Sequence, residues 1–188
     1  MKKLLVILLF LPSCIAVREN LLKPIPRLPS ESLDVSINIK ATKTMGINGI
    51  DYNFESLHKR LEEETINRFI NSKLFHNVGN DLSNYDYELV LNITTKSFDM
   101  TSMFCFFSLG IIPSYQPTEV IVQAELTNSK NQKTTKIIFK ENYTTWTQIL
   151  LIFAMPNHYP NDVIENLDND VFNNLIQKTY QQIKLQSK

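Results

Sequence analysis

Alternating hydrophobic and polar residues predict four strands between residues 33 and 146. Residues 33–41 alternate apolar and polar side chains, as expected for a strand with one wet face. Residues 84–98 repeat the pattern, with Tyr and Leu set against acidic residues. Residues 118–129 and 133–146 supply two more strands, and the polar sequence NSKNQK between them predicts a hairpin.

Two further segments have the spacing of amphipathic helices. Within residues 51–75 apolar side chains recur every three or four positions opposite a charged face, and Asn53 is placed to cap the helix start. A second helix follows a cap near Asn161. Its apolar face carries Val163, Ile164, Leu167, Val171, Phe172, Leu175 and Thr179.

The order strand, helix, three strands, helix predicts an α+β fold. We expect a single-layer antiparallel or mixed sheet of four to five strands, with two main helices packed on one face. Residues 33–188 are long enough to form this as one globular domain with its own core.

The start of the chain has the pattern of an export leader. Lys2 and Lys3 precede an unbroken apolar run from Leu4 to Leu11, and Pro12 and Ser13 follow. A charged start, a short apolar run and a small-residue exit are typical of a signal peptide, here residues 1–13. As a helix the run would be about 12 Å long, far short of a hydrocarbon core of about 30 Å.

The exit of this leader, Leu11-Pro12-Ser13-Cys14, resembles the lipobox of bacterial lipoproteins. The resemblance implies that the Cys14 thiol receives a diacylglyceryl group, that the leader is cut before Cys14, and that the new amine is acylated. Ile15 rather than Asp follows, which by the same resemblance indicates an outer-membrane lipoprotein facing the periplasm. Cys105 then has no disulfide partner, and its apolar surroundings in MFCFF favour a buried thiol.

The order of elements behind this Cys resembles periplasmic accessory lipoproteins, such as the penicillin-binding-protein activators and the curli secretion component. It also resembles uncharacterised envelope lipoproteins with an LGIIP-type stretch, here Leu109 to Pro113. The resemblance implies a small α/β domain and a non-catalytic binding or assembly role. The expected partners are the membrane, through the lipid anchor, and an envelope protein.

A different cleavage site leaves a second interpretation open. Cys14-Ile15-Ala16 fits the small-x-small pattern of ordinary signal cleavage, which would release an unanchored secreted protein. Asn92-Ile93-Thr94 and Asn142-Tyr143-Thr144 would then be glycosylation acceptors. Such a protein would bind a small apolar ligand, such as a lipid.

Residues 14–32 join the leader to the predicted domain. Pro24, Pro26 and Pro29 favour an extended segment that cannot form a helix. The segment is either a tether that holds the domain away from a membrane or an arm that lies along the domain.

Residues 103–115 and 146–159 are mostly apolar, yet too short to cross a bilayer as helices. They are either buried parts of one core or a surface that contacts the membrane interface or a partner. For the secreted alternative, they would form the ligand pocket. The candidate contact residues are Phe104, Phe106, Phe107, Ile111, Trp146, Leu150, Ile152 and Phe153.

Composition and motifs argue against catalysis and nucleic-acid binding. Without Lys2 and Lys3, 17 of the 19 basic residues remain against 19 acidic ones, and no basic stripe is found. The four glycines form neither a phosphate-binding loop nor a nucleophile elbow. His58, His76 and His158 lack a second ligand at metal spacing. We expect no catalytic residue, metal or cofactor; a hydrolase whose site forms only on folding ranks third.

Overall fold

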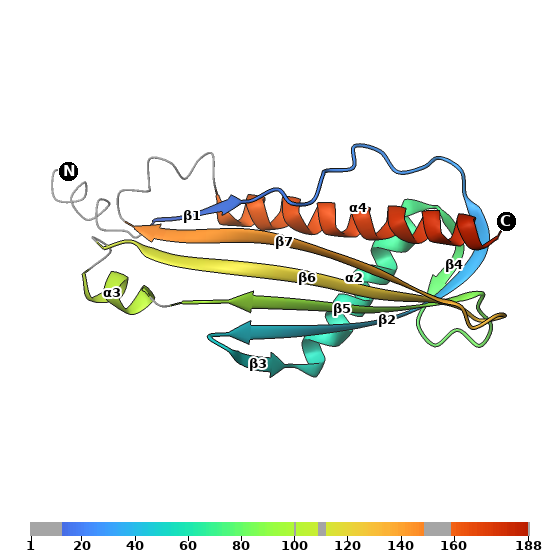
Figure 1. Ribbon diagram of the computed structural model, residues 1–188, viewed down its shortest axis with the longest axis horizontal. Helices are drawn as coiled ribbons and strands as arrows, with labels where there is room; N and C mark the ends of the chain where they lie inside the picture. Colours follow the sequence, from blue (N-terminus) through green and yellow to red (C-terminus); the bar gives the residue numbers. More distant parts are fainter. Residues whose placement is uncertain (1–12, 100, 109–111, 149–158, 188) are drawn as a thin grey trace, which may run out of the picture.

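The computed structural model describes residues 13–99, 101–108, 112–148 and 159–187. In these residues the chain forms seven strands and three helices (Figure 1). The strands are β1 (Ser13–Arg18), β2 (Leu33–Ile47), β3 (Ile50–Asn53), β4 (Phe75–Gly79), β5 (Tyr87–Ser97), β6 (Ser114–Asn128) and β7 (Thr134–Gln148). The helices are α2 (Glu55–Ser72), α3 (Ser102–Phe107) and α4 (Pro160–Gln186).

The strands form one mixed sheet in the order β1-β7-β6-β5-β2-β3, and β4 pairs with β2. The β2–β5 and β2–β4 pairs are parallel, and the others are antiparallel. Strands β2, β6 and β7 each have 15 residues. At about 3.4 Å per residue such a strand spans roughly 50 Å, so the sheet is long and has two well-separated ends (Figure 1).

One face of the sheet is buried and the other is wet, as the alternating pattern requires. Ile39, Leu89 and Leu126 stand opposite one another on β2, β5 and β6, and all three are fully buried. On the other face, Lys40 and Glu88 form an ion pair with their charged atoms 2.9 Å apart. The period of two therefore sets which side chains reach the core.

Helices α2 and α4 cover the buried face. Helix α2 packs on β2 and β4, whereas α4 packs on β1 and β7. The buried residues of α2 are Leu61, Thr65 and Phe69, which recur every four positions. Of the expected apolar face of α4, Leu167, Val171, Phe172, Leu175 and Thr179 are buried, whereas Ile164 is exposed.

The α+β class is confirmed, but the expected four to five strands and two helices are wrong. Strands β1, β3 and β4 and helix α3 were missed. Each is at most six residues long, and a short edge strand is fixed by pairing with its neighbour rather than by its own pattern. The expected caps were also wrong: Asn53 ends β3, so that Phe54 is the N-cap of α2, and α4 starts at Pro160 after Tyr159.

Residues 13–32 lie along the domain as an arm and do not form a free tether. Strand β1 pairs with β7 from Ser13 opposite Gln148 to Arg18 opposite Tyr143. Farther along, Leu22 is buried in the core, and the Asn174 side-chain amide of α4 donates to the Lys23 carbonyl at 3.1 Å. The arm is thus part of the folded domain.

Candidate functional site

Cys14 is the second residue of β1, and β1 begins at the end of the sheet where helix α3 lies (Figure 1). It stands opposite Thr147 of β7, whose hydroxyl donates to the Cys14 sulfur at 3.5 Å. The thiol of Cys105 in α3 donates to the Thr147 carbonyl at 3.4 Å. A single residue of β7 therefore contacts both Cys14 and α3.

Helix α3 is held in place by polar contacts with the chain on both sides of it. The Asp99 carboxylate accepts from the Ser102 backbone N–H at 3.0 Å, which caps the helix start. The Thr101 hydroxyl accepts from the Tyr115 backbone N–H at 2.7 Å and donates to the Tyr115 carbonyl at 3.4 Å. These contacts fix α3 against the first residues of β6.

The outward face of α3 is apolar. Met103, Phe104 and Phe107 are 69%, 62% and 76% exposed, whereas Cys105 is 6% exposed. Spacings of three and four put the first three on one side of the helix, with Cys105 on the other. The interpretation of this segment as a buried part of the core is therefore wrong for Met103, Phe104 and Phe107.

Two aromatic residues extend this surface onto the sheet. Tyr115 of β6 stands opposite Trp146 of β7, and their rings meet edge to face with centroids 4.8 Å apart. Both are partly exposed, at 42% and 36%. We give the name apolar end to six exposed residues of α3 and the neighbouring chain: Met103, Phe104, Phe107, Ile112, Tyr115 and Trp146.

Only part of the predicted contact set falls within the described structure. Phe104, Phe107 and Trp146 lie in the apolar end. The side chain of Phe106 and all of Ile111, Leu150, Ile152 and Phe153 lie outside the described residues. Met103, Ile112 and Tyr115 were missed by sequence reasoning, although the helical spacing of Met103 with Phe107 could have indicated the first.

A buried carboxylate holds β1 and the arm in position. Glu141 of β7 has a side chain with no solvent exposure, and Arg18 of β1 is 9% exposed. The guanidinium of Arg18 donates to Glu141 through Nε at 3.0 Å and Nη2 at 2.8 Å, and to Asp170 of α4 through Nη1 at 2.6 Å. Backbone N–H groups complete the set: those of Leu21, Leu22 and Asn142 each donate to the Glu141 carboxylate at 3.0 Å.

This geometry lowers the pKa of Glu141. Burial by itself raises the pKa, because it disfavours the charged carboxylate. The opposing effect of the hydrogen-bond donors on the pKa is larger than that of burial, so the pKa of Glu141 lies below its ordinary value of 4.5. These donors are the N–H of Leu22, the Arg18 guanidinium and the N–H groups of Leu21 and Asn142. Glu141 is therefore ionised in the folded protein at neutral pH.

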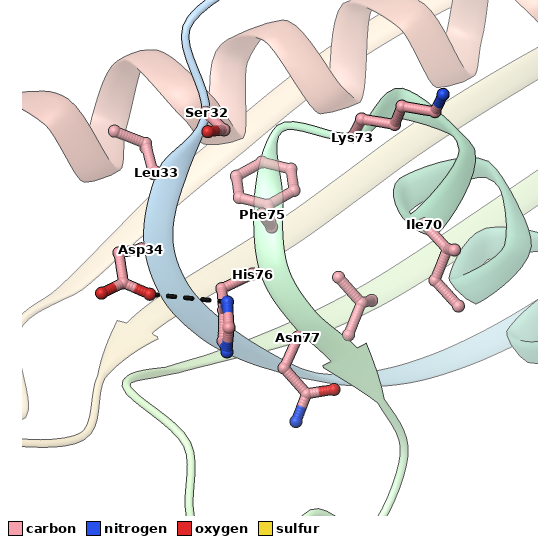
Figure 2. Close-up of a pocket in the computed structure, with 9 residues that line it drawn as sticks. Ser32, Leu33, Asp34, Ile70, Lys73, Phe75, His76 and Asn77 are labelled. Carbon is pink, nitrogen blue, oxygen red and sulfur yellow. Dashed lines mark ion pairs between the residues drawn. The ribbon is translucent and has the colours of Figure 1, made fainter.

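Strand β4 lies at the opposite end of the sheet from the start of β1 (Figure 1), and a polar groove beside β4 is shown in Figure 2. It has a volume of about 570 Å³ and is formed by the start of β2, the end of α2 and β4. Within it, Nδ1 of His76 and Oδ1 of Asp34 lie 3.6 Å apart, and both side chains are largely exposed. Strand β6 runs from the apolar end to the end of the sheet that holds the groove. At a rise of about 3.4 Å per residue, the apolar end and the groove are roughly 40 Å apart.

Within the described part of the chain, no group of three His, Cys, Asp or Glu side chains could hold a metal ion. His58 instead donates from Nε2 to the Lys43 carbonyl of β2 at 3.1 Å, and His158 lies outside the described residues. None of the described helices combines the length and the apolar character needed to cross a membrane.

No family model and no curated protein matches the chain. Similar solved structures include a Xanthomonas campestris protein assigned to DUF330, with 15% identity, a TM-score of 0.48 and coverage of 87% of this chain and 93% of that one. A putative neuraminyllactose-binding hemagglutinin homolog from Helicobacter pylori has 10% identity, a TM-score of 0.44 and coverage of 85% and 88%. A variant PelC dodecamer from Paraburkholderia phytofirmans has 9% identity, a TM-score of 0.32 and coverage of 73% and 81%. Identities and TM-scores this low carry no inference about function.

Replacing the Glu141 carboxylate should destabilise the whole domain. In Glu141→Gln, an amide NH2 faces N–H donors and the Arg18 charge loses a buried partner, so we expect a loss of about 3 kcal/mol in the free energy of unfolding. Urea unfolding followed by circular dichroism measures it. The matched control is Glu119→Gln, whose partner Lys140 is 3.0 Å away on the wet face and half exposed. Equal losses in both variants would contradict the role given to Glu141, since an exposed pair contributes less than about 1 kcal/mol.

The lowered pKa of Glu141 also predicts a pH dependence. Its contribution is fully present above the ordinary value of 4.5 and is lost as the pH falls through the lower folded value. The pKa of Asp168 is raised, mainly by burial and further by Glu64, so this group gives a slope of opposite sign. The difference between the wild type and Glu141→Gln isolates Glu141. That difference should be constant near neutral pH and shrink in acid; a constant difference down to about pH 3 would refute the assignment.

Proposed function

We propose that this protein is a lipid-anchored lipoprotein of the bacterial cell envelope, attached to the outer membrane through Cys14 and facing the periplasm. One observation carries the proposal: Cys14, which directly follows the leader pattern, lies at the same end of the sheet as the exposed apolar face of α3. An acylated Cys14 would therefore bring its lipid and the apolar end to the same membrane. The role we infer for the domain is non-catalytic binding or assembly.

The length of the sheet supports a role that reaches away from the membrane. With an anchor at Cys14, the polar groove beside β4 would lie at the far end of the molecule (Figure 1). Its lining combines charged, polar and apolar side chains, which is typical of surfaces that contact proteins. A soluble or membrane-bound envelope protein is the partner we propose for this end.

The alternative function, binding of a small apolar ligand by a secreted protein, would require an apolar cavity, and one candidate lies in the core. A space of about 180 Å³ lies between α2, α4 and the sheet. Met45, Ile93, Val120 and Phe172 are among its apolar lining residues, with Asp168 at the polar side. Ligand pockets usually measure about 300–1,000 Å³, so this cavity fits a drug-sized or lipid ligand poorly. We therefore rank the anchored protein first.

Intact mass spectrometry of the mature protein tests the anchor. We expect a chain that begins at Cys14 and carries diacylglyceryl and acyl groups, and that stays with membranes at high salt. Cys14→Ala should lose both the added mass and the cleavage before residue 14, because the thiol is the site of lipid attachment. A wild-type chain that begins at Val17 without lipid would overturn the proposal and promote the secreted alternative.

A further inference from the structure

The outward face of α3 presents three large apolar side chains to solvent in a single helical turn. Met103, Phe104 and Phe107 are each more than 60% exposed. Exposed apolar surface that is continuous in this way usually marks a contact site. The position of the face in the molecule indicates what it contacts.

We propose that the apolar end inserts into the interfacial layer of the same bilayer that holds the Cys14 lipid. This inference rests on the proposed function, because the anchor defines which membrane is near. It adds a second, non-covalent contact between the folded domain and the lipid, and so fixes the orientation of the domain.

The first argument is distance. Cys14 and Cys105 both contact Thr147, one through the hydroxyl and the other through the carbonyl. Acyl chains attached at Cys14 would therefore start within one residue of the buried side of α3. Strand β1 cannot swing the anchor away without breaking its pairing with β7.

The second argument is chemistry. Residues 100–118 contain no Asp, Glu, Lys or Arg, and neither do residues 142–161. Phe and Met favour the boundary of the acyl chains, whereas Trp and Tyr favour the headgroup level, where Trp146 and Tyr115 would lie. A protein-binding surface normally has a charged or polar rim that forms hydrogen bonds with the partner. Helix α3 itself carries no charged side chain, and the nearest acid before it in the chain, Asp99, is engaged in capping α3.

The third argument is rigidity. The capping of α3 by Asp99 and the two hydrogen bonds between Thr101 and Tyr115 hold the helix in one position. A surface that is already ordered loses little conformational entropy when it meets the membrane. The small patch can therefore bind once the anchor has brought it close.

A single tryptophan placed on α3 tests insertion directly, since Trp146 is the only tryptophan in the chain. The reporter is the full-length lipoprotein with Phe104→Trp and Trp146→Phe, purified from membranes and reconstituted in phosphatidylethanolamine–phosphatidylglycerol vesicles. Phospholipids brominated along the acyl chains quench tryptophan only on contact. We expect strong quenching, and a several-fold weaker effect after Met103→Asp is added, because a carboxylate on this face resists burial in hydrocarbon.

The matched control carries its tryptophan at the far end of the molecule, as Leu185→Trp with Trp146→Phe. Leu185 is 66% exposed near the end of α4, so the substitution leaves the core intact. This reporter should not be quenched. Equal quenching at both positions would overturn the inference. It would also be overturned if emission at position 104 changed with protein concentration but not with brominated lipid. That result would indicate that a second copy or another protein covers the apolar end.

The intact mass of the same preparations separates the two proposals. A lipidated chain whose reporter at position 104 is not quenched overturns the membrane contact and leaves the anchor in place. A chain without lipid whose reporter is quenched by added vesicles overturns the anchor and supports the contact.

Discussion

The fold depends on a buried carboxylate that is satisfied entirely by the protein. Glu141 projects from β7 into the face covered by α4, where an unpaired charge would be strongly unfavourable. Arg18 and three backbone N–H groups supply its partners. Two of those N–H groups follow Asn20, whose left-handed conformation (φ 56°) turns the chain so that consecutive N–H groups point at one anion. The charge of Glu141 thus determines the path of the N-terminal arm.

The same interaction has consequences at both ends of the arm. On one side it holds Arg18, and with it β1, against the edge of β7, so that Cys14 stays beside Thr147. On the other side it delivers Leu22 to the core, and the arm continues along α4 to an ion pair between Glu31 and Lys184. A segment with three prolines is held along the domain by these polar contacts and by the burial of Ile15, Ala16 and Leu22. Without the Glu141 site, the same residues would behave as the tether that their composition suggests.

Sequence patterns predicted the elements that bury one regular face, and missed those fixed by long-range pairing. The alternation in β2, β5, β6 and β7 and the helical periods of α2 and α4 are local signals that survive folding, because each reports a face turned to the core. Strand β1 instead begins within the predicted exit of a leader, at Ser13 and Cys14, and β4 is too short to show a period. Glu141 was overlooked in the sequence, although its position indicates that β7 has a buried partner of opposite charge. It occupies an inward position between Phe139 and Tyr143, where a lone carboxylate requires a cation from elsewhere, but the sequence could not identify Arg18 as that cation.

The apolar end is small for the membrane-binding surface that we propose, and under that proposal its small size follows from its position next to Cys14. On its own, a patch built around one helical turn would give weak and reversible binding to lipid. When a domain is already held at the surface by a covalent anchor, the second contact becomes intramolecular, and its effective concentration no longer depends on protein in solution. A few exposed side chains are then sufficient to fix the orientation of the domain at the membrane, although by themselves they would not bind the membrane tightly. Because the long strands form a rigid sheet, an orientation fixed at α3 also fixes where the groove beside β4 is presented, roughly 40 Å away.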